Sequence, residues 1–139
     1  MTNHKVKCSN FEIANDKPFT LISGPCQLEN ETHAMKISTE LKKITEELGI
    51  NLIYKTSFDK ANRTSIDGTR GLGFESGLEL IRDVAEHSSV KTCVDFHEPH
   101  QIDRAFSQLL LPNIIQIPAF LCRQTDLLIS AAKTNKAFN

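Results

Sequence analysis

Residues 52–65, Leu52-Ile53-Tyr54-Lys55-Thr56-Ser57-Phe58-Asp59-Lys60-Ala61-Asn62-Arg63-Thr64-Ser65, join a short apolar run to a loop rich in basic and hydroxyl side chains. The run 52–54 predicts a buried strand, and the loop after it lacks the apolar spacing of an amphipathic helix. So many charged and polar groups cannot be buried without many partners. Basic and hydroxyl groups on a loop that leaves a strand are suited to holding phosphates and carboxylates. A solvated loop without a ligand is the plain alternative.

Length and charge narrow the class of protein. The chain has 139 residues, enough for one domain with a sizeable core. It carries 16 Lys and Arg against 17 Asp and Glu, which argues against nucleic acid or an anionic membrane as partner. No apolar run approaches the roughly 18 residues of a membrane span. We therefore expect a protein that binds small molecules and has no membrane or nucleic-acid partner.

The cysteines and the start of the chain indicate a compartment. Residues 1–7 lack the apolar centre of a signal peptide. Cys8, Cys26, Cys93 and Cys122 are scattered without paired spacing. We expect reduced thiols and a cytoplasmic location rather than disulfides.

Short apolar strands alternate with amphipathic helices along most of the chain. Residues 1–18 are predicted to form a hairpin or an extended arm, because Phe11 and Ile13 alternate before the turn signal at 15–18. Strands are expected at 19–23, 52–56, 90–96 and 114–117, with a fifth beginning at 137–138. The first helix is expected to start after Asn30 as N-cap and to close at Gly49. The fourth is expected to have Thr125 or Asp126 as its N-cap.

Each predicted helix has an apolar face that we expect to be buried. The expected inward residues are Ala34, Ile37, Leu41, Ile44 and Leu48; Leu78, Ile81 and Ala85; Ile102, Ala105, Phe106 and Leu109; and Leu127, Leu128, Ala131 and Ala132.

This alternation predicts a parallel sheet with right-handed crossovers. Every polar motif of interest directly follows a strand, and in a parallel sheet these positions share one edge, where ligand sites are built. The motifs are 24–26, 55–65, 95–99 and 116–120. The sequence therefore predicts one ligand site at the carboxyl ends of the strands.

A closed barrel of such units needs eight of them and about 250 residues. This sequence supplies four and the start of a fifth, so we expect residues 19–139 to be the N-terminal half of a (β/α)8 TIM barrel, from a fragment or a split protein. A complete small doubly wound α/β domain is the alternative.

Two long strings support a resemblance. Residues 55–63 and 116–126 (Gln116-Ile117-Pro118-Ala119-Phe120-Leu121-Cys122-Arg123-Gln124-Thr125-Asp126) resemble the N-terminal half of the 3-deoxy-D-manno-octulosonate 8-phosphate synthase family, also called 2-dehydro-3-deoxyphosphooctonate aldolase. The resemblance covers the chain from about Asn10 onward. It implies a (β/α)8 barrel, a homotetramer, and condensation of phosphoenolpyruvate with D-arabinose 5-phosphate for lipopolysaccharide synthesis.

The resemblance also implies roles for individual residues. Lys60 and Asn62 would be catalytic. Lys55, Ser57 and Lys60 would meet the carboxylate and phosphate of phosphoenolpyruvate. The sugar phosphate would be bound by Asn62, Arg63 and Thr64, and by Arg123 of a neighbouring subunit.

Two further strand exits complete the expected site. Gln116 and the backbone amide of Ala119 would close the phosphoenolpyruvate pocket, with the turn fixed by Pro118. Asp95 would contact substrate or instead form a hydrogen-bonding pair with His97.

Cys26 indicates a subtype through the resemblance. The family divides into a metal-dependent branch with cysteine at this position and a metal-independent branch with asparagine. The cysteine implies a divalent transition metal such as iron, zinc or manganese, because thiolate suits these ions better than magnesium. The remaining ligands would lie in the second half of the barrel, so one cysteine makes no closed site here. Without the resemblance, a small buried thiol is the simpler interpretation.

Two alternatives to this function remain. In the first alternative the chain is an inactive truncated remnant. Departures from the family pattern at Thr64, 67–68 and Asn135 would be consistent with this alternative. Otherwise it is a 3-deoxy-arabino-heptulosonate 7-phosphate synthase, against which the string 59–63 argues, because that family has Lys-Pro-Arg-Thr there. In either case we expect the 139-residue chain alone to be inactive.

Overall fold

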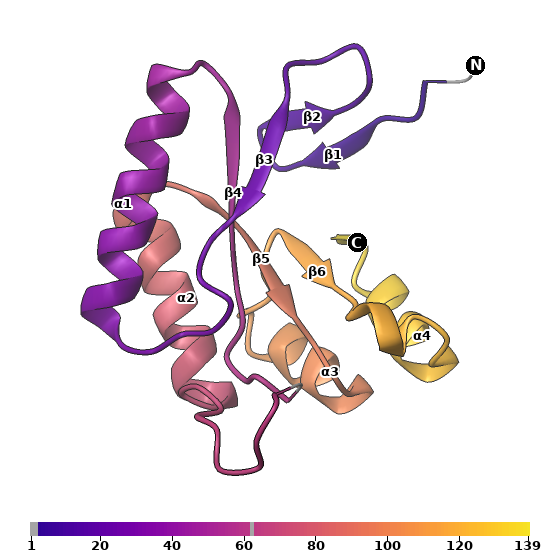
Figure 1. Cartoon of the computed structure of the whole chain (residues 1–139). Helices are drawn as coiled ribbons and strands as arrows, with labels where there is room; N and C mark the ends of the chain where they lie inside the picture. The colour runs from indigo at the N-terminus through magenta and orange to yellow at the C-terminus, as the bar shows by residue number, and fades with distance from the viewer. Residues whose placement is uncertain (1–2, 62) are drawn as a thin grey trace.

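The centre of the molecule is a five-stranded parallel sheet, in a computed structural model that describes residues 3–61 and 63–139 (Figure 1). The strands are paired in the order of the chain, without the reversal that defines a doubly wound sheet. The predicted parallel sheet is confirmed, and the doubly wound alternative is wrong. The strands are β3 (Thr20–Ser23), β4 (Asn51–Thr56), β5 (Lys91–Asp95), β6 (Ile114–Gln116) and β7 (Ala137–Phe138).

Four helices connect these strands: α1 (Glu31–Glu47), α2 (Phe74–Ser88), α3 (Pro99–Ser107) and α4 (Thr125–Lys133). The predicted N-cap of α1 is confirmed, since Asn30 Oδ1 accepts the backbone N–H of His33 at 2.9 Å. The prediction for α4 was wrong, because the N-cap is Gln124 rather than Thr125 or Asp126. A short 3-10 turn, η1 (Ala119–Leu121), separates β6 from α4.

All four helices pack on one face of the sheet. That face carries three buried strand residues, Tyr54, Val94 and Ile115. They form a single core together with residues from every helix. The helical contributions to this core include Ala34, Leu78, Ile102 and Leu127. Helices that stay on one face require crossovers of one hand, as in the wall of a barrel.

The opposite face of the sheet is covered at one end by a hairpin. Strands β1 (Val6–Cys8) and β2 (Phe11–Ile13) pair antiparallel, which confirms a hairpin over an extended arm. Cys8 packs with the buried strand residues Ile53, Cys93 and Ile114 in a second, smaller cluster. This end of the face is therefore apolar, and the opposite end is left for polar side chains.

Some predicted core positions proved to be exposed. Leu48 is the C-cap of α1 and is 66% exposed, and Leu109 follows α3 in a left-handed conformation and is 90% exposed. Ile44 lies outside the core because Ser38 and Thr45 take the inward positions of α1. Their hydroxyls are satisfied by Ser88 Oγ at 2.7 Å and by the Leu41 carbonyl at 2.9 Å.

The remaining departures are smaller. Phe106 and Ala132 are exposed, and Ala85 is half-buried. Ile37, Leu41 and Leu128 are half-buried but pack against the core, as predicted. Within the described ranges, none of the helices has the combined length and apolar character needed to cross a bilayer.

Candidate active site

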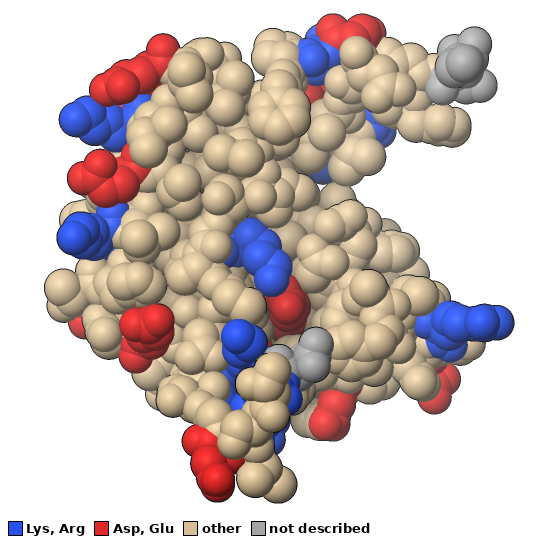
Figure 2. All heavy atoms as spheres, in the orientation of Figure 1, with Lys and Arg blue, Asp and Glu red and all other residues tan. Residues whose placement is uncertain are grey.

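A cleft of about 510 Å³ lies at the carboxyl ends of β4, β5 and β6. Figure 2 shows basic side chains gathered beside an acidic group in the middle of one face of the molecule. The residues that line the cleft are Cys26, Lys55, Ser57, Asp59, Lys60, Ala61, Asp95, His97, Gln116, Pro118, Ala119 and Phe120. Residues from all four predicted strand exits therefore meet in one place.

The sheet register explains why three of these side chains point into the cleft. Alternate residues of a strand face the same side, so Lys55 points to the same face as Ile53, which is the face that the hairpin covers at its other end. By the same alternation Asp95 follows Cys93, and Gln116 pairs directly with Asp95. Each strand thus places one apolar residue under the hairpin and one polar residue at the cleft.

Lys55 and Asp95 form an ion pair across neighbouring strands, with Lys55 Nζ 2.8 Å from Asp95 Oδ1. Asp95 is therefore paired with Lys55 and not with His97, contrary to one of the two expected arrangements. Within the described part of the chain, His97 Nδ1 has no hydrogen-bond partner, and the His97 ring stacks edge-on with Phe58.

The hydroxyl and amide groups of the site are held by local hydrogen bonds. Ser57 Oγ donates to the Asp59 carbonyl at 2.6 Å and accepts the Asp59 N–H at 3.3 Å. Gln116 Oε1 accepts a hydrogen bond from Asn139 Nδ2 at 3.0 Å. Ligand binding through Ser57 or Gln116 would have to replace these contacts.

Gly24 brings Cys26 to the cleft. A Cβ atom at Gly24 would lie 2.1 Å from the Lys55 carbonyl oxygen, so only glycine allows the exit of β3 to approach β4 this closely. Cys26 follows two residues later and is exposed at the cleft.

A second hollow of about 460 Å³ adjoins the first and shares Lys60 with it. It is lined by Gln27, Lys60, Arg63, Thr64, Ser65, Gly68 and Thr69. The Arg63 guanidinium is folded onto its own loop, where it donates to the Ile66 carbonyl at 3.0 Å. Two neighbouring hollows, each with cationic and hydroxyl groups, are suited to two anionic ligands.

Two predicted site residues are not found in either hollow. Arg123 is exposed and lines neither hollow, so its assignment to a neighbouring subunit stays a prediction. Asn62, predicted to be catalytic, lies outside the described residues.

The implied metal does not fit the described residues by themselves. Among residues 3–61 and 63–139, no three His, Cys, Asp or Glu side chains are grouped as metal ligands. Cys26 supplies a single thiol, whereas protein transition-metal sites use three or four ligands. Metal binding through Cys26 stays a prediction, and no step of the chemistry below depends on it.

The Asp59–Arg70 pair is the part of the site that sequence reasoning missed. Arg70 Nε lies 2.8 Å from Asp59 Oδ1, and Arg70 Nη2 lies 2.5 Å from Asp59 Oδ2. The hydrogen bond from Arg70 is the main cause that lowers the pKa of Asp59, with burial opposing it. The sequence did contain a signal for this pair, since Asp59 is an acidic residue within a basic loop. A partly buried carboxylate requires a cationic partner.

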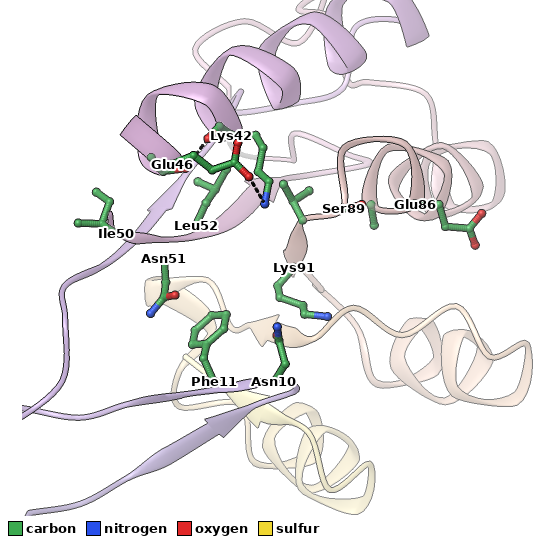
Figure 3. Close-up of a pocket in the computed structure, with 13 residues that line it drawn as sticks. Asn10, Phe11, Lys42, Glu46, Ile50, Asn51, Leu52, Glu86, Ser89 and Lys91 are labelled. Carbon is green, nitrogen blue, oxygen red and sulfur yellow. Dashed lines mark hydrogen bonds and ion pairs between the residues drawn. The ribbon is translucent and has the colours of Figure 1, made fainter. Parts of the chain in front are cut away.

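Another hollow, of about 490 Å³, lies at the opposite ends of the strands (Figure 3). It is bordered by Asn10 and Phe11 of the hairpin region and by the ends of α1 and α2. Its Lys42 is paired with Glu46 at 3.0 Å, and its Thr45 hydroxyl donates to helix carbonyls. This hollow lies at the amino ends of β4 and β5, whereas parallel sheets build their ligand sites at the carboxyl ends, so it is the weaker candidate for a ligand site.

Comparison with known proteins decides the family. The family model described as DAHP synthetase I family matches residues 3–139. The chain belongs to the DAHP synthetase I family. A 2-dehydro-3-deoxyphosphooctonate aldolase of Rickettsia felis is 50% identical over 131 residues, which are 94% of this chain and 47% of that protein. One of Brucella anthropi is 46% identical over 137 residues, which are 99% of this chain and 48% of that protein.

These relatives confirm the resemblance found in the sequence. As a member of the DAHP synthetase I family, the chain aligns over nearly its whole length with proteins named for an aldolase activity. It spans about half the length of the curated relatives it matches.

Proposed function

We propose that this chain supplies the substrate-binding half of a site that condenses phosphoenolpyruvate with D-arabinose 5-phosphate. The products would be 3-deoxy-D-manno-octulosonate 8-phosphate and inorganic phosphate. The observation that carries the proposal is the pair of adjoining hollows that share Lys60, because the reaction needs two phosphorylated substrates in contact. The relatives are named as phosphooctonate rather than heptulosonate enzymes, which supports the choice of reaction.

Phosphoenolpyruvate is assigned to the cleft between β4 and β6. Its carboxylate and phosphate would be met by Lys60 and Lys55, with Ser57, Gln116 and the Ala119 amide as neutral partners. Asp95 holds Lys55 at the cleft through the 2.8 Å ion pair. Because that pair already balances one positive charge, Lys60 is the cation on which anion binding depends most.

The sugar phosphate is assigned to the second hollow, with Arg63 and Thr64 as its ligands. The Arg63 guanidinium would exchange its carbonyl partner in the loop for phosphate oxygens, which bind guanidinium more strongly. The aldehyde end of the sugar would then lie toward Lys60, next to phosphoenolpyruvate.

In the proposed reaction the third carbon of phosphoenolpyruvate forms a bond to the aldehyde carbon, and the aldehyde oxygen takes up a proton. Water adds to the second carbon and supplies the proton that the aldehyde oxygen takes up. The new hydroxyl then loses its proton to the departing phosphate as the bond between the second carbon and the phosphate oxygen breaks, which leaves a keto group. The described side chains would contribute mainly by holding the two anions in reacting geometry. We expect turnover only where a second half of the barrel completes the site.

Titration of the full chain with phosphoenolpyruvate by calorimetry tests the proposal. We expect binding that Lys60→Ala weakens about tenfold or more, because a charged partner of the anion is lost. Lys43→Ala, an exposed change on α1, is the matched control and should leave the affinity unchanged. Absence of phosphoenolpyruvate binding by the unaltered chain would contradict the proposed function.

The acceptor sugar separates the two related activities. With phosphoenolpyruvate present, we expect D-arabinose 5-phosphate to bind more tightly than D-erythrose 4-phosphate. The opposite preference would favour the heptulosonate reaction for which the family model is described.

A further inference from the structure

Arg70 has no part in the roles described so far, although it contacts the loop that carries them. It lies at the far end of the loop 60–70, well beyond the strand exit. Its guanidinium donates two hydrogen bonds to the carboxylate of Asp59, at 2.8 and 2.5 Å. A fork of this kind fixes direction as well as distance, which a single charge contact does not.

The backbone closes the loop at the same place. The Lys60 N–H donates to the Arg70 carbonyl at 2.6 Å, and the Gly73 N–H donates to the Phe58 carbonyl at 3.0 Å. Gly71 has φ +109°, and a Cβ there would lie 2.6 Å from the Phe58 carbonyl oxygen. The two stems of the loop are thus joined by hydrogen bonds on both sides of the Asp59–Arg70 pair.

The loop that begins at this junction contributes residues to each hollow. Asp59 and Lys60 border the cleft, while Lys60, Arg63 and Thr64 border the second hollow. The Asp59 carboxylate would oppose an anionic ligand in the cleft if its charge were not balanced by Arg70. The pair therefore sets the position of Lys60 and also removes a repulsive charge from beside it.

Global stability accounts for only part of the pair. The side chain of Asp59 is 18% exposed and needs a cationic partner, but that of Arg70 is 56% exposed, and solvent at the guanidinium limits what the pair contributes to the free energy of folding. That contribution does not account for the place of the two hydrogen bonds, which fix the base of a ligand-bearing loop.

We propose that Arg70 is a positioning residue, which acts through Asp59 to hold Lys60 and the loop 60–70 in the geometry that binds the two phosphorylated substrates. The assignment of the ligands rests on the proposed function, but the effect of Arg70 on the loop does not. The two can therefore be tested separately.

Hydrogen exchange and ligand titration of the full chain test the proposal together. In Arg70→Ala we expect amide exchange in segment 60–70 to rise at least about tenfold and phosphoenolpyruvate affinity to fall about tenfold. Asp59→Asn should have a similar effect on exchange, and the double variant should add little to either single change, since both remove one interaction. Arg70→Lys should restore only part of the affinity, because an ammonium cannot form the fork.

Arg82→Ala is the matched control. Arg82 is 51% exposed and contacts a neighbouring carboxylate, Asp83, on the surface of α2, away from the loop. We expect it to change neither exchange in segment 60–70 nor affinity. Both arginine variants should stay folded, with at most a small fall in the unfolding midpoint for Arg70→Ala, because Asp59 then lacks its cationic partner.

The outcomes separate the two proposals. Unchanged exchange in Arg70→Ala, or an equal loss of affinity in Arg82→Ala, would overturn the role of Arg70. If the parent chain fails to bind phosphoenolpyruvate, the proposed function is refuted, and the exchange comparison alone decides whether Arg70 positions the loop.

Discussion

Tyr54 lies directly beneath the cleft, on the helix-covered face of the sheet. Its side chain is fully buried, and its hydroxyl donates to the Ala34 carbonyl over a long 3.4 Å contact. Burial disfavours the phenolate and raises the pKa of Tyr54 to about 12. The fold therefore holds this side chain in its neutral form.

The sign of this shift predicts a loss of stability at alkaline pH. Below the usual pKa of 10 the neutral phenol contributes its full share to folding, and the contribution falls as pH rises from 10 towards 12. Tyr54 is the only tyrosine of the chain, so near-ultraviolet absorbance of tyrosinate reports it alone. We expect a native titration midpoint well above 10 that returns to about 10 in concentrated urea. A native midpoint at 10 would contradict the buried phenol, and Tyr54→Phe should abolish the signal while remaining folded.

Sequence reasoning found residues whose place at the end of a strand brings them to the cleft. Cys26, Lys55 and Gln116 were predicted from where strands end, and the structure brings them together. It did not find Arg70, because that residue acts through a contact across a loop. The path of a loop leaves no periodic pattern in the sequence. Roles for Asn62, Arg123 and the metal remain predictions.

Phe58 is where β4, α2 and the loop 60–70 meet. Its ring contacts Phe74 and Phe96 edge-on, with centroids 5.4 and 5.7 Å away. Gly77, in the first half of α2, lies so close that an added Cβ would be 2.4 Å from Phe58 Cβ. The helix thus approaches the strand exit as closely as glycine allows.

This contact decides the sign of a substitution in α2. Within a helix, Gly→Ala alone would stabilise by about 1 kcal/mol. The overlap with Phe58 should cost about 1–3 kcal/mol, because the core there has no room to accept a methyl group. We therefore expect Gly77→Ala to lower the free energy of unfolding, as measured in urea. Ser76→Ala, its exposed neighbour, is the control, and a stabilised Gly77→Ala would show that the packing is looser than described.

The elements themselves were predictable, whereas the burial of some helix residues was not. Alternating apolar runs and the cap at Asn30 located the strands and α1. The exposure of Ile44 depends on which residues of α1 turn inward. Ser38 does so with its hydroxyl bonded both to the Met35 carbonyl of its own helix and to Ser88 of α2. Such pairings join distant parts of the chain and leave no local pattern.

Over the whole molecule, the inner face of the sheet has two chemically different ends. The hairpin covers Ile53, Cys93 and Ile114 at one end, and the cleft opens at the other. Burial raises the pKa of Cys93 to about 12 and also raises that of Cys8. Both thiols are therefore neutral and shielded while the hairpin stays in place.

Thiol labelling tests this arrangement. A thiol reagent at neutral pH should modify Cys26 and Cys122 rapidly, because both are exposed. Cys8 and Cys93 are buried and should react only as the chain unfolds, with the same denaturant dependence as the loss of structure. Cys26→Ser should remove one fast thiol and neither slow one. Rapid reaction of Cys93 in the native chain would mean that the hairpin does not cover the sheet.

The cross-strand pair of Lys55 with Asp95 has a consequence for assembly of the sheet. If β4 slipped by one residue against β5, the Lys55 ammonium would turn towards the helices and Tyr54 would turn towards the hairpin and open cleft. A slipped β4 would leave one charge buried without its counter-ion, at a cost of several kcal/mol. The same two side chains that line the cleft thus also fix the alignment of the two strands, because a misaligned pair would be too unstable to persist as the protein folds.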